Sequence, residues 1–234
     1  MDRATPVAQG ASAGTAGRPP YRFAQDIIGG VDSQTGHKGW HSRGYLPHLD
    51  DPERIQFLTF RLADSMPQNV LASWEDELKS MAPRARNVEF RHRAEHFLDR
   101  GIGSCALRDE ANANIVEASL TYLADQRYRL YAWVIMPNHV HALIHPFEGF
   151  TLGKIISSWK RFTATRINNR LGVREQLWYD DYFDRYMRNE DHFWDTVSYI
   201  ESNPVVAGLC SEVTQWPFSS ARYDWNNEGS RILT

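Results

Sequence analysis

Three features are scarce or absent in this sequence, and each absence excludes a class of protein. The two cysteines, Cys105 and Cys210, show no C-x-x-C spacing, so neither a disulfide framework nor a cysteine zinc site is expected. No apolar run approaches the ~20 residues that span a bilayer, so no contact with a membrane is expected. The net charge of -3 argues against non-specific coating of DNA, although it leaves room for a local basic groove. A cytoplasmic protein fits all three absences.

What is present predicts one globular domain with flanking segments. Hydrophobic residues make up 42% and aromatic residues 12% of the 234 residues, enough for a continuous core. Residues 1–50 lack periodic apolar spacing and a secretory signal, and we expect them to form a flexible or partly docked N-terminal arm. The domain is predicted to span residues 51–225, with a C-terminal tail at 226–234.

Hydrophobic periodicity predicts strands that alternate with helices. One strand is expected at 55–62, and a hairpin is expected at 127–135 and 139–145, around a turn-like Met-Pro-Asn sequence. This order predicts an α+β fold, with helices packed on an antiparallel sheet. Residues 178–186 form an aromatic segment, and the last helix is expected to stop before Pro204. The expected helices span 68–82, 84–100, 107–124, 152–171 and 190–202.

Two histidines, His139 and His141, flank Val140 in the second strand of the hairpin. Side chains alternate across a strand, so both imidazoles share one face and Val140 points to the opposite, buried face. Such a pair can bind one metal ion, although nine histidines in the chain make one such pair unsurprising by chance. His145 shares the same face, which leaves open a zinc site of three histidines in a hydrolytic metalloenzyme.

Tyr199 and Asn203 lie four residues apart near the end of the last predicted helix, so their side chains share one face. A tyrosine hydroxyl, with a pKa near ~10, is a weak nucleophile at neutral pH unless a divalent cation polarises the phosphate beside it. The histidine pair and Tyr199 would therefore complement each other in phosphodiester chemistry. The alternative is that Tyr199 faces the core and Asn203 only ends the helix.

A segment of one charge sign lies between these two motifs. Residues 151–174 contain no Asp or Glu, although the chain has more acidic than basic residues, 29 against 26. Such a helix beside the site would attract a DNA backbone, or it is simply a solvated basic face. The residues predicted to bind DNA are Lys154, Lys160, Arg161, Arg166 and Arg170.

The string Met136-Pro137-Asn138-His139-Val140-His141 resembles the hallmark of the REP-associated tyrosine transposases of bacteria. These transposases are single-tyrosine HUH endonucleases, in which U is a hydrophobic residue, here Val140. Further stretches match in the family's order, so the similarity covers about residues 54–222. The matching stretches are 158–163, 182–188, 199–209 and 216–221.

The resemblance implies a role for each candidate residue. His139 and His141 match the family's paired metal ligands, and Tyr199 matches its nucleophile. Asn203 matches the polar residue that completes the metal site in related transposases. The implied fold is a ferredoxin-like antiparallel sheet packed with helices, with the HUH motif on a central strand and the tyrosine on a helix.

The resemblance also implies a reaction and a partner. The reaction is hairpin-specific cleavage of single-stranded DNA through a 5′-phosphotyrosine, followed by strand transfer, with Mg²⁺ or Mn²⁺ and without a nucleotide cofactor. The partner is a REP-like DNA hairpin, bound at the nucleoid by a monomer or homodimer. Two other functions stay open: a domesticated hairpin-binding protein without catalysis, and the metallohydrolase, in which Tyr199 is only structural.

Overall fold

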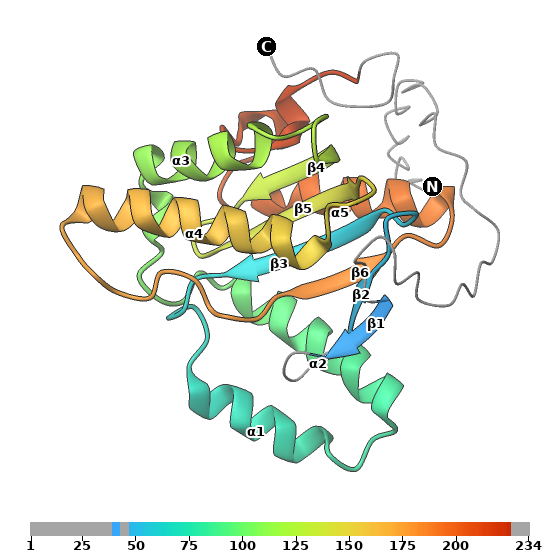
Figure 1. Cartoon of the computed structure of the whole chain (residues 1–234). Coiled ribbons are helices and arrows are strands. Elements are labelled where there is room, and N and C mark those ends of the chain that lie inside the picture. Colours follow the sequence, from blue (N-terminus) through green and yellow to red (C-terminus); the bar gives the residue numbers. More distant parts are fainter. Residues whose placement is uncertain (1–38, 43–46, 226–234) are drawn as a thin grey trace, which may run out of the picture.

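The structure, a computed structural model, describes residues 39–42 and 47–225 (Figure 1). Most of the predicted N-terminal arm and the whole predicted tail lie outside these residues, so the predicted domain boundaries stay predictions. None of the described helices is long and apolar enough to cross a membrane. The strands and α-helices are, in chain order, β1 (Gly39–Ser42), β2 (Pro47–Asp50), β3 (Gln56–Arg61), α1 (Gln68–Leu78), α2 (Pro83–Leu98), α3 (Glu110–Thr121), β4 (Tyr128–Ile135), β5 (His139–Pro146), α4 (Leu152–Leu171), β6 (Phe183–Tyr186) and α5 (Glu190–Val206).

A four-stranded antiparallel sheet organises the domain, in the order β4-β5-β3-β6. The sequence β3-α3-β4-β5-α4-β6 threads this sheet with its second and fourth strands at the edges, which is the ferredoxin-like arrangement. β5, the strand of His139 and His141, is an inner strand, and Tyr199 lies on α5. The predicted fold class is confirmed at each of these points.

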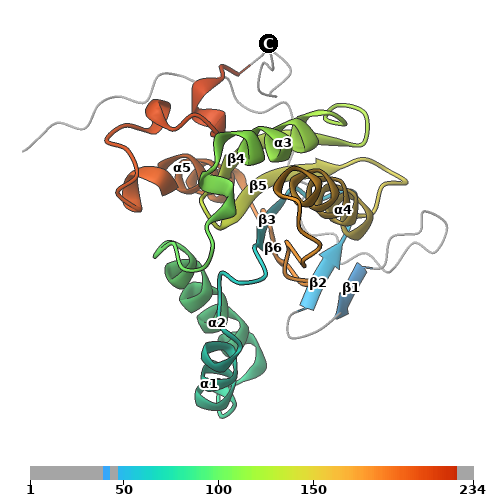
Figure 2. The same cartoon turned by 90° about the vertical axis from the view of Figure 1, so that its left-hand side faces the viewer.

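The two faces of the sheet are covered by different helices (Figure 2). α3 and α4 cover one face, where Val140 is buried in the largest core cluster. α5 covers the other face, where its Ile200 packs with Leu143 in a second cluster. Because side chains alternate along β5, His139 and His141 point to the face of α5.

α1 and α2, which follow β3 and precede α3 in the chain, form a helix pair that extends away from the sheet (Figure 1). Their apolar side chains Leu71, Leu78, Phe90 and Leu98 make a third cluster, against which Phe183 of β6 packs. Full burial of one such side chain contributes about 1.5–3 kcal/mol, so this cluster is enough to hold the pair on the sheet edge. The C-terminal end of α2 is thereby fixed near the start of β5.

The last helix is longer than the sequence predicted, because it runs through Pro204 to Val206. A proline lacks an amide hydrogen, so at this position it removes one intrahelical hydrogen bond. The following amides still close the last turn, since Ala207 donates to Asn203 at 2.9 Å and Leu209 donates to Pro204 at 2.8 Å. The predicted stop before Pro204 was therefore wrong.

β1, β2 and β6 were not predicted as strands, and β2 is tied to the region of β6 by a buried polar cluster. His48 is fully buried, and its ring nitrogens contact carboxylates of Asp184 and of Asp181, the latter at 3.0 Å. The Leu49 amide also donates to Asp184 at 3.0 Å. Burial disfavours the charged ring, but the hydrogen bonds and charges of the two aspartates outweigh burial and raise the pKa of His48 to about 9. Short strands with polar contacts carry little periodicity, which explains why the sequence did not reveal them.

Candidate active site

The turn between β4 and β5 sets the protonation of the first histidine. Asn138 is buried, and its Nδ2 donates to the carbonyls of Leu98 at 3.2 Å and Ile102 at 2.9 Å. Its Oδ1 therefore faces His139 Nδ1, at 2.7 Å, and because Oδ1 can only accept, that nitrogen carries the ring proton. Nε2 of His139 is left as a lone pair that a cation can bind.

The Nε2 atom of His141 points toward the Nε2 atom of His139. His141 Nδ1 lies 2.8 Å from Thr59 Oγ1, and His141 Nε2 lies 3.1 Å from Nε2 of His139. Two nitrogens bound to one ion at ~2.1 Å and at a right angle would be ~3 Å apart. Burial lowers the pKa of both rings, to about 3 for His139, so both stay neutral. The pair has the spacing and protonation that metal binding requires.

Asp99, at the end of α2, is a third candidate ligand that the sequence did not reveal. Its carboxylate lies 3.9 Å from His139 Nε2, and the ligand atoms of Asp99, His139 and His141 all lie within 4.8 Å of one another. Its Oδ1 is buried without a hydrogen bond, and burial raises its pKa to about 6. A negative charge at a helix C-terminus is also disfavoured. The chain by itself gives this carboxylate little stabilisation, as expected of a group that binds a cation.

α5 places Tyr199 beside His141. The ring centroids of these two residues are 5.4 Å apart, and the Tyr199 ring meets Phe57 edge to face at 5.9 Å. Val197 and Ile200 hold the helix against the sheet, and Tyr199 lies at the flank of this buried stripe. Its hydroxyl is buried and makes no hydrogen bond of normal geometry with any described residue.

The surroundings keep the Tyr199 phenol protonated. Burial is the main cause that raises its pKa above the ordinary range, and the negative charges of Glu95 and Asp99 add to the rise. The Asn203 side chain, one helical turn away, opposes the shift, while its own Oδ1 is buried and accepts no hydrogen bond from the described part of the chain. A cation together with a phosphate group would satisfy the polar atoms that Asp99, Tyr199 and Asn203 leave without partners.

Part of this chain is similar to known proteins. Residues 105–203 match the family described as IS200-like transposases. A REP-associated tyrosine transposase of Escherichia coli strain K12 is 28% identical over 100 residues, which make up 43% of this chain and 58% of that protein. The chain is thus similar to the REP-associated tyrosine transposases over this region. The match spans little more than half of that curated relative, and it confirms the resemblance found in the sequence motifs.

A solved structure of a REP-associated tyrosine transposase bound to a REP hairpin is also similar. It is 21% identical, with a TM-score of 0.42, and the match covers 77% of this chain and 93% of the other.

His145 does not join the pair of His139 and His141, although it lies on the same face of β5. At ~3.3 Å per residue, it is ~13 Å from His141 along the strand. Its Nε2 instead lies 2.7 Å from the carbonyl of Pro52. This geometry excludes a site in which all three histidines bind one ion.

The basic helix α4 lies across the sheet from the two histidines, not beside them as the sequence order suggested (Figure 2). Lys160 Nζ donates to the carbonyls of residues 179, 180 and 181 at 2.8–3.1 Å and helps to hold that segment. Arg170 pairs with Asp109 at 3.0 Å. The assignment of the five basic residues to DNA binding stays a prediction. The remaining three are exposed: Lys154, Arg161 and Arg166.

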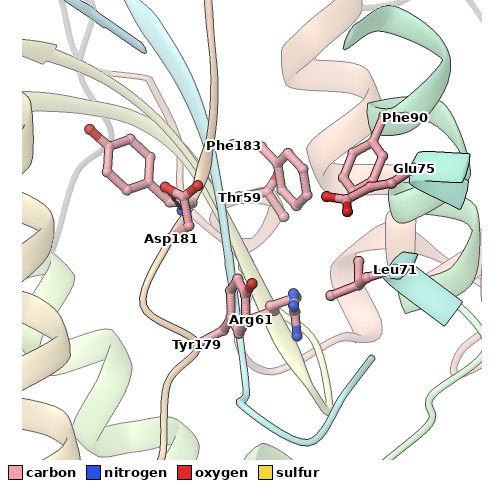
Figure 3. A pocket seen from close by; sticks show the side chains of 9 residues that line it. Thr59, Arg61, Leu71, Glu75, Phe90, Tyr179, Asp181 and Phe183 are labelled. Atoms are coloured by element: carbon pink, nitrogen blue, oxygen red, sulfur yellow. Dashed lines mark hydrogen bonds between the residues drawn. The ribbon is translucent and has the colours of Figure 1, made fainter. Parts of the chain in front are cut away.

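A small pocket borders the candidate site at Thr59 (Figure 3). Arg61 and Tyr179 stack at 3.7 Å on one side of it, and Phe90 and Phe183 contribute aromatic rings. Its volume of about 20 Å³ is space for about one water molecule. Its lining residues pack beside the candidate site.

Proposed function

We propose that the protein is a hairpin-specific, single-stranded DNA endonuclease and strand transferase whose nucleophile is Tyr199. The observation that carries the proposal is the position of this tyrosine, 5.4 Å from the ring of His141 at the edge of the group formed by two histidines and Asp99. The match to IS200-like transposases and the REP-associated relative support a reaction on DNA strands. A metal-binding group and a tyrosine beside it are what such a reaction requires.

Tyr199 Oη attacks the phosphorus of a phosphodiester, in line with the departing 3′-oxygen. The phenolic proton is released as the Oη–P bond forms, and the P–O3′ bond breaks to give a 3′-hydroxyl and a 5′-phosphotyrosine. Attack of another 3′-hydroxyl on this linkage joins the strands and returns the phenol. Each step exchanges one phosphodiester for another, so the reaction needs no nucleotide cofactor.

The proposed metal is Mg²⁺ or Mn²⁺, held by Nε2 of His139 and of His141 and by the Asp99 carboxylate. Mixed nitrogen and oxygen ligation suits either ion. When bound, the ion supplies charge that stabilises the phosphate and the phenolate. Asn203, the ligand proposed from the sequence, offers its partnerless Oδ1 as a further oxygen. Asn138 and Thr59 hold the two imidazoles in the orientation that such binding needs.

The proposed substrate is single-stranded DNA next to a REP-like hairpin, in keeping with the REP-associated relative. The exposed residues Lys154, Arg161 and Arg166 of α4 would bind the hairpin backbone on the face of the sheet away from the tyrosine. The hairpin and the cleavage site would then lie on opposite sides of one sheet edge. A cytoplasmic location at the nucleoid and a monomeric or homodimeric state are parts of the same proposal.

A hairpin-binding protein without catalysis is the second candidate. Binding alone needs the exposed basic residues of α4, but it does not need partnerless polar atoms in the interior. Among the described residues, three such atoms gather at this one place, on Asp99, Tyr199 and Asn203, and each costs about 1–3 kcal/mol of stability. Such a cost is expected at a site that performs chemistry, which favours the catalytic proposal.

The test is the formation of an SDS-resistant protein–DNA adduct in Mn²⁺ with labelled hairpin DNA from beside the gene. Wild type is expected to form the adduct and Tyr199→Phe is not. Tyr122→Phe, at a side chain that is 77% exposed, is the matched control and should react like wild type. His141→Gln should abolish the adduct, while His145→Gln should leave it. Hairpin binding without an adduct would replace this proposal with the binding protein.

A further inference from the structure

Arg185 is an exposed arginine at the edge of the candidate active site. It lies on β6 directly opposite Phe57 of β3, so its side chain shares the face that carries His141 and Tyr199. Its guanidinium carbon is 5.3 Å from the centroid of the Phe57 ring. That ring lies 5.3 Å from His141 and 5.9 Å from Tyr199. One aromatic ring is thus the common neighbour of a guanidinium, a metal-ligand candidate and the nucleophile candidate.

Burial raises the pKa of Glu95 and the charge of Arg185 opposes this rise, but the hydrogen-bond donors of Arg185 are not used to hold the described fold. The guanidinium makes neither a hydrogen bond nor an ion pair with residues that the structure describes. The neighbouring Arg91 differs, because it donates to the carbonyls of Asn87 at 3.2 Å and Asp184 at 3.1 Å. The donors of the Arg185 guanidinium are therefore available to a ligand at this edge of the site.

We propose that Arg185 binds the phosphate that is cleaved and holds it in line with Tyr199. This inference rests on the proposed function. A phosphodiester carries a negative charge and two free oxygens, which match the two parallel donors of a guanidinium. The contact with Phe57 restricts the planar group before DNA arrives. Arg185 thus places a positively charged side chain one aromatic ring away from Tyr199, where it can bind the phosphate in addition to the proposed ion.

The experiment measures whether Arg185 interacts with that one phosphate. The cleavage position is first mapped from the 3′-hydroxyl end that wild type releases in Mn²⁺, and a second oligonucleotide carries an uncharged methylphosphonate there. In the non-cleaving Tyr199→Phe background, Arg185→Gln is expected to weaken binding of the natural oligonucleotide about 10-fold. It should weaken binding of the methylphosphonate oligonucleotide less than about twofold, because the charge that it contacted is already gone.

Arg188→Gln is the matched control. Arg188 is also exposed, and its loss removes the same charge two residues beyond β6. Arg188→Gln is expected to weaken binding of both oligonucleotides by equal factors, because Arg188 contributes only to the overall electrostatic attraction of DNA. Arg185→Lys keeps the charge but loses the two parallel donors, so its adduct rate should fall between those of wild type and Arg185→Gln.

In the Tyr199-containing protein, Arg185→Gln should slow adduct formation about 10²- to 10³-fold at saturating DNA, which is typical for removal of one preorganised donor. Its unfolding temperature should stay within about 2 °C of wild type, because the side chain is exposed. Equal weakening of both oligonucleotides, or an unchanged adduct rate, would overturn the role of Arg185 alone. A wild-type protein that forms no adduct would remove the proposed function and this inference with it.

Discussion

Asn138 joins three parts of the candidate site through one side chain. Its Nδ2 holds the end of α2, next to Asp99, by the carbonyls of Leu98 and Ile102, and its Oδ1 fixes the proton of His139. Asn138 therefore sets the tautomer of the His139 ring and helps to fix the position of the Asp99 carboxylate. Hydrogen bonds that orient the ligands of a metal strongly influence the affinity of the site for the metal.

Replacement of Asn138 by alanine should damage both properties. Loss of the side chain leaves two carbonyls and the His139 Nδ1 proton without their partner, so the free energy of unfolding should fall by about 2–3 kcal/mol. Affinity for Mn²⁺ should fall about 10- to 100-fold. Chemical denaturation and the Mn²⁺-dependent shift of the unfolding temperature measure the two effects. Asn169→Ala, at an exposed position of α4, should change neither.

Asp99→Asn should change stability and metal affinity in opposite directions. The substitution removes a half-buried negative charge at a helix C-terminus, whose Oδ1 makes no hydrogen bond with the described residues, so the metal-free protein should be more stable by about 1 kcal/mol. The Mn²⁺-induced rise in the unfolding temperature should shrink, because an amide replaces the anionic ligand. A metal-induced rise equal to that of wild type would show that Asp99 is not a ligand.

At the scale of elements, the docking of β2 onto β6 makes stability depend on pH. The folded-state pKa of His48 is about 9, above its ordinary value of 6.5, because Asp181 and Asp184 outweigh burial. The associated stabilisation is therefore complete below about pH 6.5 and is lost as the pH rises through about 9.

Wild type should lose on the order of 2 kcal/mol of unfolding free energy between pH 6.5 and pH 9, and His48→Gln should lose much less. Urea denaturation at a series of pH values measures this difference. His92→Gln, at an exposed position of α2, should keep the wild-type dependence. Parallel pH profiles of wild type and His48→Gln would refute the charged cluster.

Helix α4 shows why neighbours in sequence are not neighbours at a site. It directly follows β5, the strand of the two histidines, yet it lies on the opposite face of the sheet. Its own Ile155 and Ile156 pack there in the core cluster that contains Val140. A ferredoxin-like connection places α4 beside α3, and only the later helix α5 returns to the histidine face. Tyr199 reaches His141 for this reason, whereas the basic side chains of α4 do not.

At the scale of the whole molecule, the sequence predicted the main helices, the β4–β5 hairpin and the candidate residues His139, His141 and Tyr199. The paired histidines and Tyr199 lie on regular elements whose periodicity is strong, so their meeting on one face followed once the fold was known. Asp99 escaped notice because it comes from a distant segment that tertiary packing brings to the site. Arg185 lies in the matching stretch 182–188, but its position beside Phe57 follows only from the pairing of β6 with β3. Hydrophobic periodicity predicts on which face of its own helix or strand a residue lies. It does not predict which other helices and strands pack against that face.

The central claim is that Tyr199 becomes covalently joined to the 5′ side of a cleaved DNA strand. The adduct formed in Mn²⁺ can be digested with nuclease and trypsin and analysed by mass spectrometry. Tyr199 is the only tyrosine of the tryptic peptide 189–222, so the site of attachment can be assigned. The account predicts this peptide with a nucleotide attached through its 5′-phosphate. A nucleotide on another residue, or one attached through a 3′-phosphate, would contradict it.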